Sequence, residues 1–148
     1  MALLDLIKPE LIKVPLAGVE KNDILYEMIG VLRDAGKIND VEEAFRVVRA
    51  REDQGSTGLA DGIAVPHAKT KLVDKLTMAI GISPGGVDFS SLDGKPSQIF
   101  FMMLAPPDQS GPHIEALSEI ARITRSGSFV RLLSQARNAK EVAELFEG

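Results

Sequence analysis

The feature of the chain most suited to chemistry is a histidine that directly follows a predicted strand. His67 stands in the segment GIAVPHAK at 62–69, where the preceding proline restricts the backbone and presents the imidazole in a narrow range of directions. Glycines upstream leave room for a bulky anion to approach. If Arg51, Lys69 and Lys71 come near it, such an imidazole is suited to take and return a phosphoryl group as a nucleophile. The alternative is an ordinary surface histidine at a strand end.

The other histidine begins a predicted helix. His113 closes the segment PPDQSGPH at 106–113, which leaves a buried strand and enters a helix. The free N–H groups and the positive dipole of a first helical turn favour a bound anion. The same dipole disfavours an imidazolium, so we expect a neutral ring that donates one hydrogen bond. First-turn histidines often have no role, but α/β sheets place their sites on such loops, and both histidines therefore predict one shared site.

Composition excludes several other kinds of chemistry. The chain has 148 residues, which predicts one domain, and it has no cysteine, which excludes disulfides, thiolate zinc sites and cysteine nucleophiles. Two histidines are too few for a site of three imidazoles. The formal net charge of −4 is unsuited to nucleic-acid binding, which needs a basic surface.

Hydropathy gives no sign of membrane insertion or of secretion. The longest apolar stretch, 99–107, is far shorter than the roughly 20 residues that span a bilayer. Residues 1–9 lack the basic and apolar regions of a signal peptide. We therefore expect a cytoplasmic protein.

Helical and extended patterns alternate along the chain. Strands are predicted at 11–14, 63–65, 76–82 and 99–104, with a hairpin in the turn-rich stretch 83–96. Helices are predicted to begin at Asn22, Asp40, Pro112, Ser128 and Asn138. The stretch 99–104 has the continuous apolar character of a strand covered on both faces. Together these patterns predict a single α/β domain with a central sheet flanked by helices on both faces.

A family resemblance rests on three runs, RE at 51–52, GSTGL at 55–59 and GIAVPHAK at 62–69. Together they resemble the active-site signature of enzyme IIA of the bacterial phosphoenolpyruvate-dependent sugar phosphotransferase system, in its fructose/mannitol class and nearest the fructose type. The resemblance covers essentially the whole chain, 1–148, as one enzyme IIA domain with a mixed central sheet. Ala60 stands where fructose-type members usually have Gly, and Asp61 where Asn or His is frequent; these departures concern the conformation of the loop.

The resemblance implies a phosphotransferase that works through a phosphohistidine, without metal or cofactor. His67 would accept a phosphoryl group from the carrier HPr and pass it to a cysteine of enzyme IIB, and the permease enzyme IIC would be involved only indirectly. His113 would donate a hydrogen bond to the phosphoryl group and Arg51 would stabilise its charge. From the residues themselves, Thr57 is a candidate to hydrogen-bond the ring or the phosphoryl group, with a plain turn residue as the alternative. Lys69 is a candidate to steer the incoming phosphoprotein, with a solvated surface charge as the alternative. Partners would dock around the active histidine, where we expect a ring of apolar residues, an apolar collar. Its candidates are Leu59, Ile63 and Ala68.

Three other interpretations remain open at this point. A nitrogen-regulatory branch shares the signature, although Ala68, where that branch often has Gly, favours the sugar branch. A hydrolase would pair Ser56 or Thr57 with His67 and Asp61, but nothing resembles a nucleophile elbow. A metal site would need both histidines with a carboxylate, either Asp61 or Asp108.

Overall fold

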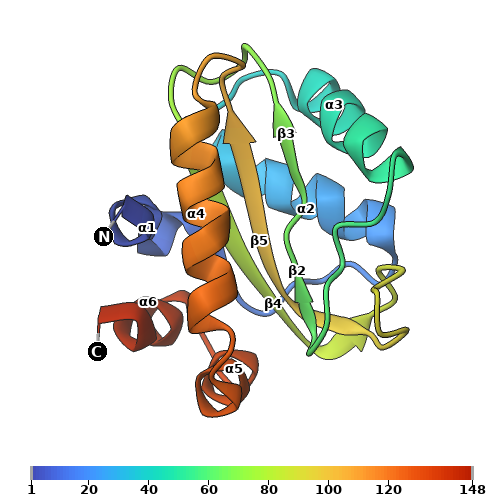
Figure 1. Ribbon diagram of the computed structural model, residues 1–148, viewed down its shortest axis with the longest axis vertical. Coiled ribbons are helices and arrows are strands. Elements are labelled where there is room, and N and C mark those ends of the chain that lie inside the picture. The colour runs from blue at the N-terminus through green and yellow to red at the C-terminus, as the bar shows by residue number, and fades with distance from the viewer. Residues whose placement is uncertain (1, 148) are drawn as a thin grey trace.

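One mixed sheet with helices on both faces makes up the fold (Figure 1). The computed structural model describes residues 2–147. The strands are β1 (Ile12–Lys13), β2 (Ile63–Ala64), β3 (His67–Lys69), β4 (Thr77–Val87) and β5 (Ser97–Ala105). They lie in the order β1-β4-β5-β2, with β3 following β2 along the same side of β5; β4 and β5 are antiparallel and the other pairs are parallel. The predicted fold class is confirmed.

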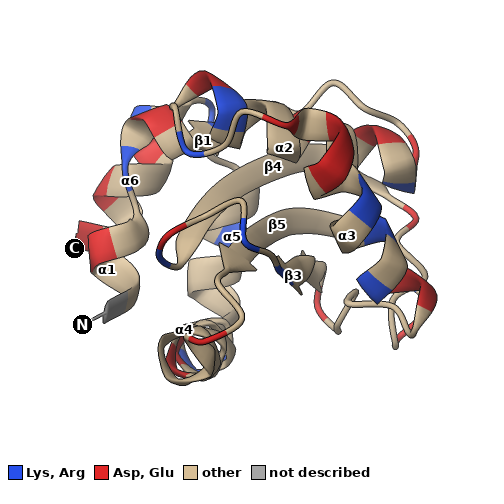
Figure 2. Ribbon diagram, turned by 90° about the horizontal axis from the view of Figure 1, so that it is seen from above, with Lys and Arg blue, Asp and Glu red and all other residues tan. Residues whose placement is uncertain are grey.

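Two helical layers cover this sheet. The helices are α1 (Ala2–Leu6), α2 (Lys21–Asp34), α3 (Val41–Asp53), α4 (Ser110–Ile123), α5 (Gly127–Ser134) and α6 (Ala139–Glu147), with a 3₁₀ turn η1 (Pro9–Leu11) before β1. α2 and α3 share one apolar cluster with one face of the sheet, and α1, α4, α5 and α6 share a second cluster with the other face (Figures 1 and 2). The core therefore consists of two apolar layers separated by the strands.

The central strand β5 is buried on both sides, as its apolar run predicts. Phe100, Met102 and Leu104 belong to the cluster of α2 and α3, whereas Phe101 and Met103 belong to the opposite cluster. Alternate side chains of a strand point to opposite faces, so both faces of this strand are apolar. The prediction of a strand covered on both faces is confirmed.

Large and small residues alternate along β4 for a steric reason. Its large residues at even positions of 78–82 pack against the layer of α1, α4, α5 and α6. On the opposite face, a Cβ built on Gly81 would lie 2.5 Å from Met28 Sδ and 2.7 Å from Leu16 Cδ1. The absence of a side chain at this position therefore allows α2 to approach the sheet closely.

Helix starts follow the predicted capping chemistry at one site and depart from it at another. Asp40 caps α3, because its Oδ1 accepts a hydrogen bond of 3.0 Å from the Glu43 amide. Asn22, the predicted cap of α2, instead lies inside the helix. The cap is Glu20, which forms a reciprocal capping box with Asp23.

The helix that carries the second histidine begins earlier than the sequence suggests. α4 starts at Ser110 rather than at Pro112, and its buried residues include His113. Ile114, the next residue along, is 63% exposed. α5 and α6 begin within one residue of their predicted starts, whereas the short helix α1 is not evident from the sequence.

Candidate active site

The fold brings the two histidines together. β3 presents His67 and pairs in parallel with the end of β5 at 103–105, so both strands end at the same edge of the sheet. The chain then turns through 106–109 into α4, which places His113 over that edge. The two imidazole rings lie with their centroids 5.0 Å apart and their planes at 78°. The predicted proximity of the two histidines is confirmed.

A cavity of about 400 Å³ opens beside this pair. Its walls come from β3, the start of α4 and the last two turns of α3. The lining residues are Arg46, Val47, Ala50, Arg51, Gln54, His67, Ala68, Lys69 and His113. None of them is acidic, and three are permanently cationic, so the cavity is suited to a small anion.

A single hydrogen bond determines which nitrogen of His67 is free. Nδ1 lies 2.7 Å from the carbonyl oxygen of Val65, and because a carbonyl can only accept, Nδ1 carries the proton. In the neutral ring the lone pair is then on Nε2. Burial is the largest effect and lowers the pKa of His67. The hydrogen bond to the Val65 carbonyl opposes it, the Arg51 charge lowers the pKa further, and the Glu52 charge raises it least. A neutral imidazole with a free Nε2 is the nucleophilic form.

His113 is neutral for a related reason. His113 is only 4% exposed. This burial, together with the charges of His67 and Lys69, lowers the pKa of His113 to about 4. Burial, rather than the helix dipole expected from the sequence, is therefore the main cause of the neutral state. In the part of the chain that the structure describes, Nε2 of His113 is buried without a hydrogen-bond partner. Such an atom costs about 1–3 kcal/mol, which a bound oxygen would offset.

This low pKa predicts a pH-dependent contribution to stability. An unfolded chain protonates His113 near 6.5 and the folded chain only near 4, so the unfolded state binds more protons between these values. The contribution of His113 to the free energy of unfolding is complete above pH 6.5. It is lost as the pH falls toward 4, and the loss is at most about 3 kcal/mol. His113→Gln should lose less unfolding free energy than the wild type over this range in urea titrations. Identical pH profiles for the two proteins would contradict the prediction.

Cationic side chains surround the histidine pair on two sides. Arg51, at the end of α3, donates from Nη1 to the Gly55 carbonyl at 2.8 Å. Lys69, at the end of β3, donates to Ser110 Oγ at 2.8 Å and so connects this strand to the start of α4. Figure 2 shows basic residues gathered along α3, next to β3. The predicted residues Arg51 and Lys69 both line the cavity.

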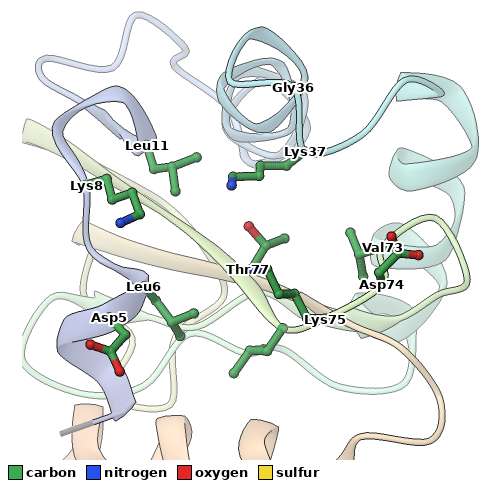
Figure 3. A pocket seen from close by; sticks show the side chains of 11 residues that line it. Asp5, Leu6, Lys8, Leu11, Gly36, Lys37, Val73, Asp74, Lys75 and Thr77 are labelled. Carbon is green, nitrogen blue, oxygen red and sulfur yellow. The ribbon is translucent and has the colours of Figure 1, made fainter.

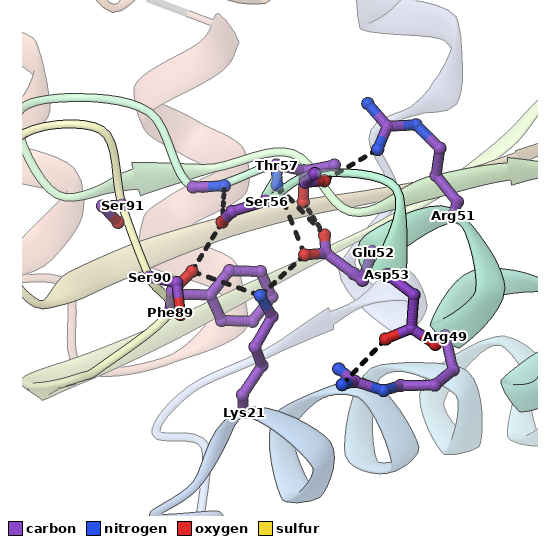
Figure 4. Close-up of polar contacts among 12 residues, drawn as sticks. Lys21, Arg49, Arg51, Glu52, Asp53, Ser56, Thr57, Phe89, Ser90 and Ser91 are labelled. Carbon is purple, nitrogen blue, oxygen red and sulfur yellow. Dashed lines mark hydrogen bonds and ion pairs between the residues drawn. The ribbon is translucent and has the colours of Figure 1, made fainter.

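Thr57 has a different position from the one that the sequence suggested. It is buried, does not line the cavity, and donates its hydroxyl to the carboxylate of Glu52 (Figure 4). Its amide also donates to both oxygens of that carboxylate at 3.3 Å. The Thr57 hydroxyl therefore donates to Glu52 in place of the expected donation to a phosphoryl group.

Two of the three residues expected in an apolar collar are buried. Ile63 and Ala68 belong to the core clusters, so neither can form an exposed docking surface, and that expectation is wrong. Leu59 is half-buried and stays a candidate. Ile114, directly after His113, is the exposed apolar side chain that the sequence analysis missed. The apolar pattern of this helix could not show that Ile114 is exposed, because the pattern does not say which face of α4 is buried.

The hydrolase and metal interpretations have no support in the geometry. The hydroxyl of Ser56 donates to the Phe89 carbonyl at 2.7 Å and accepts from the Gly58 amide at 3.0 Å. Both roles hold it in the loop as a structural group. Among the described residues, no three His, Cys, Asp or Glu side chains gather closely enough to hold a metal ion.

A separate cavity of about 380 Å³ lies between α1, the end of α2 and the start of β4 (Figure 3). Its lining includes Asp5, Lys8, Lys37, Asp74, Lys75 and Thr77. Lys37 follows the C-terminal end of α2, where exposed helix carbonyls favour a positive charge. Lys37 thus has a structural explanation, and neither histidine lies in this cavity.

Comparison with known proteins identifies the family of this chain. A family model described as "Phosphoenolpyruvate-dependent sugar phosphotransferase system, EIIA 2" matches residues 5–148. A Bacillus subtilis relative, "PTS system fructose-specific EIIABC component", is 35% identical over 98% of this chain, which spans 23% of that longer protein. A Haloferax volcanii relative, "PTS system fructose-specific EIIA component", is 31% identical over 92% of this chain and 88% of its own length. The chain therefore belongs to the EIIA 2 family of the phosphoenolpyruvate-dependent sugar phosphotransferase system.

Regulatory proteins are also among the relatives. A "Nitrogen regulatory protein" of Bradyrhizobium diazoefficiens is 30% identical over 96% of this chain and 92% of its own length. A crystal structure of "Nitrogen Regulatory Protein IIA-Ntr" from Neisseria meningitidis superposes with a TM-score of 0.89 at 28% identity, covering 98% of this chain and 99% of that one. The resemblance to this family and to its regulatory branch is thus confirmed.

The helices of residues 2–147 are all too short or too polar to cross a membrane.

Proposed function

We propose that this chain is a phosphocarrier, an enzyme IIA domain over 1–148 that accepts a phosphoryl group from phospho-HPr on His67. The observation that carries the proposal is the geometry of His67, whose Nδ1 proton is held by the Val65 carbonyl, leaving Nε2 as the nucleophile beside a cationic cavity. Family membership supports phosphotransfer in general.

In the accepting step, the Nε2 lone pair of His67 forms a bond to phosphorus while the nitrogen–phosphorus bond on the donor breaks. The donor imidazole keeps the electron pair of that bond. Transfer of a metaphosphate-like group depends mainly on positioning and on electrostatic stabilisation. Arg51 stabilises the charge on the equatorial oxygens, and the unpartnered Nε2 of His113 donates to one of them when it carries the proton. Lys69 adds positive charge at the cavity mouth.

In the delivering step, a cysteine thiolate of enzyme IIB attacks phosphorus and the bond to His67 breaks. His67 recovers its lone pair and its neutral state. A structure described as a "Complex of enzyme IIAMTL and phosphorylated enzyme IIBMTL" from Escherichia coli shares the fold, with a TM-score of 0.81 at 21% identity. For this chain, we propose that the partner docks over the exposed Ile114, directly after His113, with the half-buried Leu59 as a further candidate contact.

Delivery to enzyme IIB distinguishes a sugar-uptake role from a regulatory one. The phosphorylated protein, prepared with phosphoenolpyruvate, enzyme I and HPr, is mixed with the enzyme IIB of a fructose-type system. We expect the phosphoryl group to move to IIB, and not to a IIB variant whose cysteine is replaced by serine. If the label stays on the carrier while IIB accepts from its own IIA, the sugar-uptake role is wrong. The similarity to nitrogen regulatory proteins then favours the regulatory alternative.

A further inference from the structure

A buried carboxylate lies directly behind the cationic cavity. Glu52 follows Arg51 in the last turn of α3, and its side chain has an exposed fraction of 0%. Its oxygens accept hydrogen bonds from the amide and the hydroxyl of Thr57, and they lie 2.8 Å from Lys21 Nζ (Figure 4). A carboxylate removed from water needs such partners, because an unpaired buried charge is very costly.

Lys21, the first residue of α2, connects this carboxylate to the hairpin between β4 and β5. Its ammonium lies 4.6 Å from the centre of the Phe89 ring and donates to the Phe89 carbonyl at 3.3 Å. The same carbonyl accepts from Ser56 at 2.7 Å. The loop 55–58 is therefore attached on one side to α3 through Glu52 and on the other side to the hairpin.

This loop in turn holds the arginine of the cavity. Arg51 donates to the carbonyl of Gly55, the first residue of the loop, at 2.8 Å. Displacement of the loop would therefore displace the guanidinium that faces His67. The charge of Glu52 also reaches His67, where it raises the pKa of the imidazole while Arg51 lowers it.

We propose that Glu52 and Lys21 act as a pair of positioning residues for phosphoryl transfer at His67, an inference that rests on the proposed function. Neither residue lines the cavity; both act through the loop 55–58 and Arg51. Glu52 holds the loop, and Lys21 neutralises Glu52 so that no uncompensated negative charge lies behind the bound phosphoryl group. The ammonium is needed because the carboxylate is buried, whereas an exposed pair would be screened by water.

The proposed pairing of Glu52 with Lys21 predicts an unusual result for a double variant. Lys21→Met leaves the Glu52 carboxylate buried and unpaired, and should slow transfer from phospho-HPr by about tenfold or more. Glu52→Gln retains an acceptor for Thr57 and should slow transfer less. Glu52→Gln combined with Lys21→Met removes both charges, so it should transfer faster than Lys21→Met alone. Single-turnover rates measured by rapid quench give these comparisons.

The ion pair of Lys13 and Glu27 provides a matched control. It has the same 2.8 Å separation and joins β1 to α2, away from the cavity. Lys13→Met should leave the transfer rate unchanged. If Lys13→Met slows transfer as much as Lys21→Met does, the effect is one of general stability and the proposal is wrong.

A titration that needs no phosphoryl donor separates this proposal from the proposed function. NMR of the imidazole of His67 should show its pKa lowered in Glu52→Gln and raised in Lys21→Met, with near-wild-type circular dichroism in both. These opposite shifts, together with a faster double variant, support the pair. Shifts of the same sign, no shift in either variant, or a double variant slower than both single variants would overturn it. A further outcome is that wild type accepts no phosphoryl group while the opposite shifts still appear. In that case the proposed function and the positioning role both fail, but the charge coupling between the pair and His67 is established.

Discussion

His67→Ala is expected to abolish phosphorylation completely while leaving the fold intact. The variant removes the imidazole whose Nε2 is the proposed nucleophile, and alanine offers no substitute acceptor. The side chain is half-buried and makes a hydrogen bond to Val65 and an edge contact with His113. Losing these contacts should lower the free energy of unfolding by about 1–2 kcal/mol at most.

Intact mass after incubation with phosphoenolpyruvate, enzyme I and HPr measures this effect. Wild type should gain one acid-labile phosphoryl group and His67→Ala none. His113→Ala should reach the wild-type mass more slowly, because it keeps the acceptor and loses only a hydrogen-bond donor. A phosphorylated His67→Ala variant would assign the nucleophile to another residue. An unfolded His67→Ala variant would show that the fold needs this side chain. A His113→Ala variant that is never phosphorylated would show that the nucleophile and the hydrogen-bond donor are wrongly assigned.

The second large effect is expected for Arg51→Met, which should slow transfer by about 100- to 1,000-fold. Its guanidinium lines the cavity and is held by the Gly55 carbonyl, so it is positioned before the phosphoryl group arrives. Preorganised charge of this kind needs no rearrangement at the moment of reaction. Methionine retains much of the length and the apolar contacts of the side chain, and removes the charge.

Single-turnover transfer from phospho-HPr is the appropriate measurement for Arg51→Met. Arg49→Met is the matched control, since Arg49 lies on the same helix but pairs with Asp53 and does not line the cavity. We expect the control to transfer at nearly the wild-type rate. Equal rates for Arg51→Met and wild type would show that the guanidinium does not contact the transferred group.

Local chemistry explains why much of this protein could be predicted from the sequence. The run at 99–104 is apolar at every position, which only a strand covered on both faces requires. Asp40 and Glu43 stand at capping distance, and that contact depends on one turn of backbone alone. The segment 62–69 combines a glycine, a proline and a histidine within a short stretch, so its chemistry was visible without the fold.

The mistaken expectations share a physical cause, which is that burial depends on what packs against a residue. Ile63 and Ala68 flank the histidine in sequence, but successive side chains of a strand point to opposite faces, and here both faces are covered. Ile114 fits an apolar stripe on its helix, yet α4 packs through His113, Ala116 and Ile120 instead.

By itself, the sequence determined the family and predicted that two histidines share one site with His67 as its nucleophile, because each of these depends on residue types within short segments. Only the tertiary structure decided which nitrogen of His67 is free and what holds Arg51 in place. The first depends on a carbonyl two residues away whose direction the backbone sets. The second depends on Lys21, Glu52 and Phe89, which lie far apart in the chain and meet only because α2, α3 and the hairpin pack on one side of the sheet.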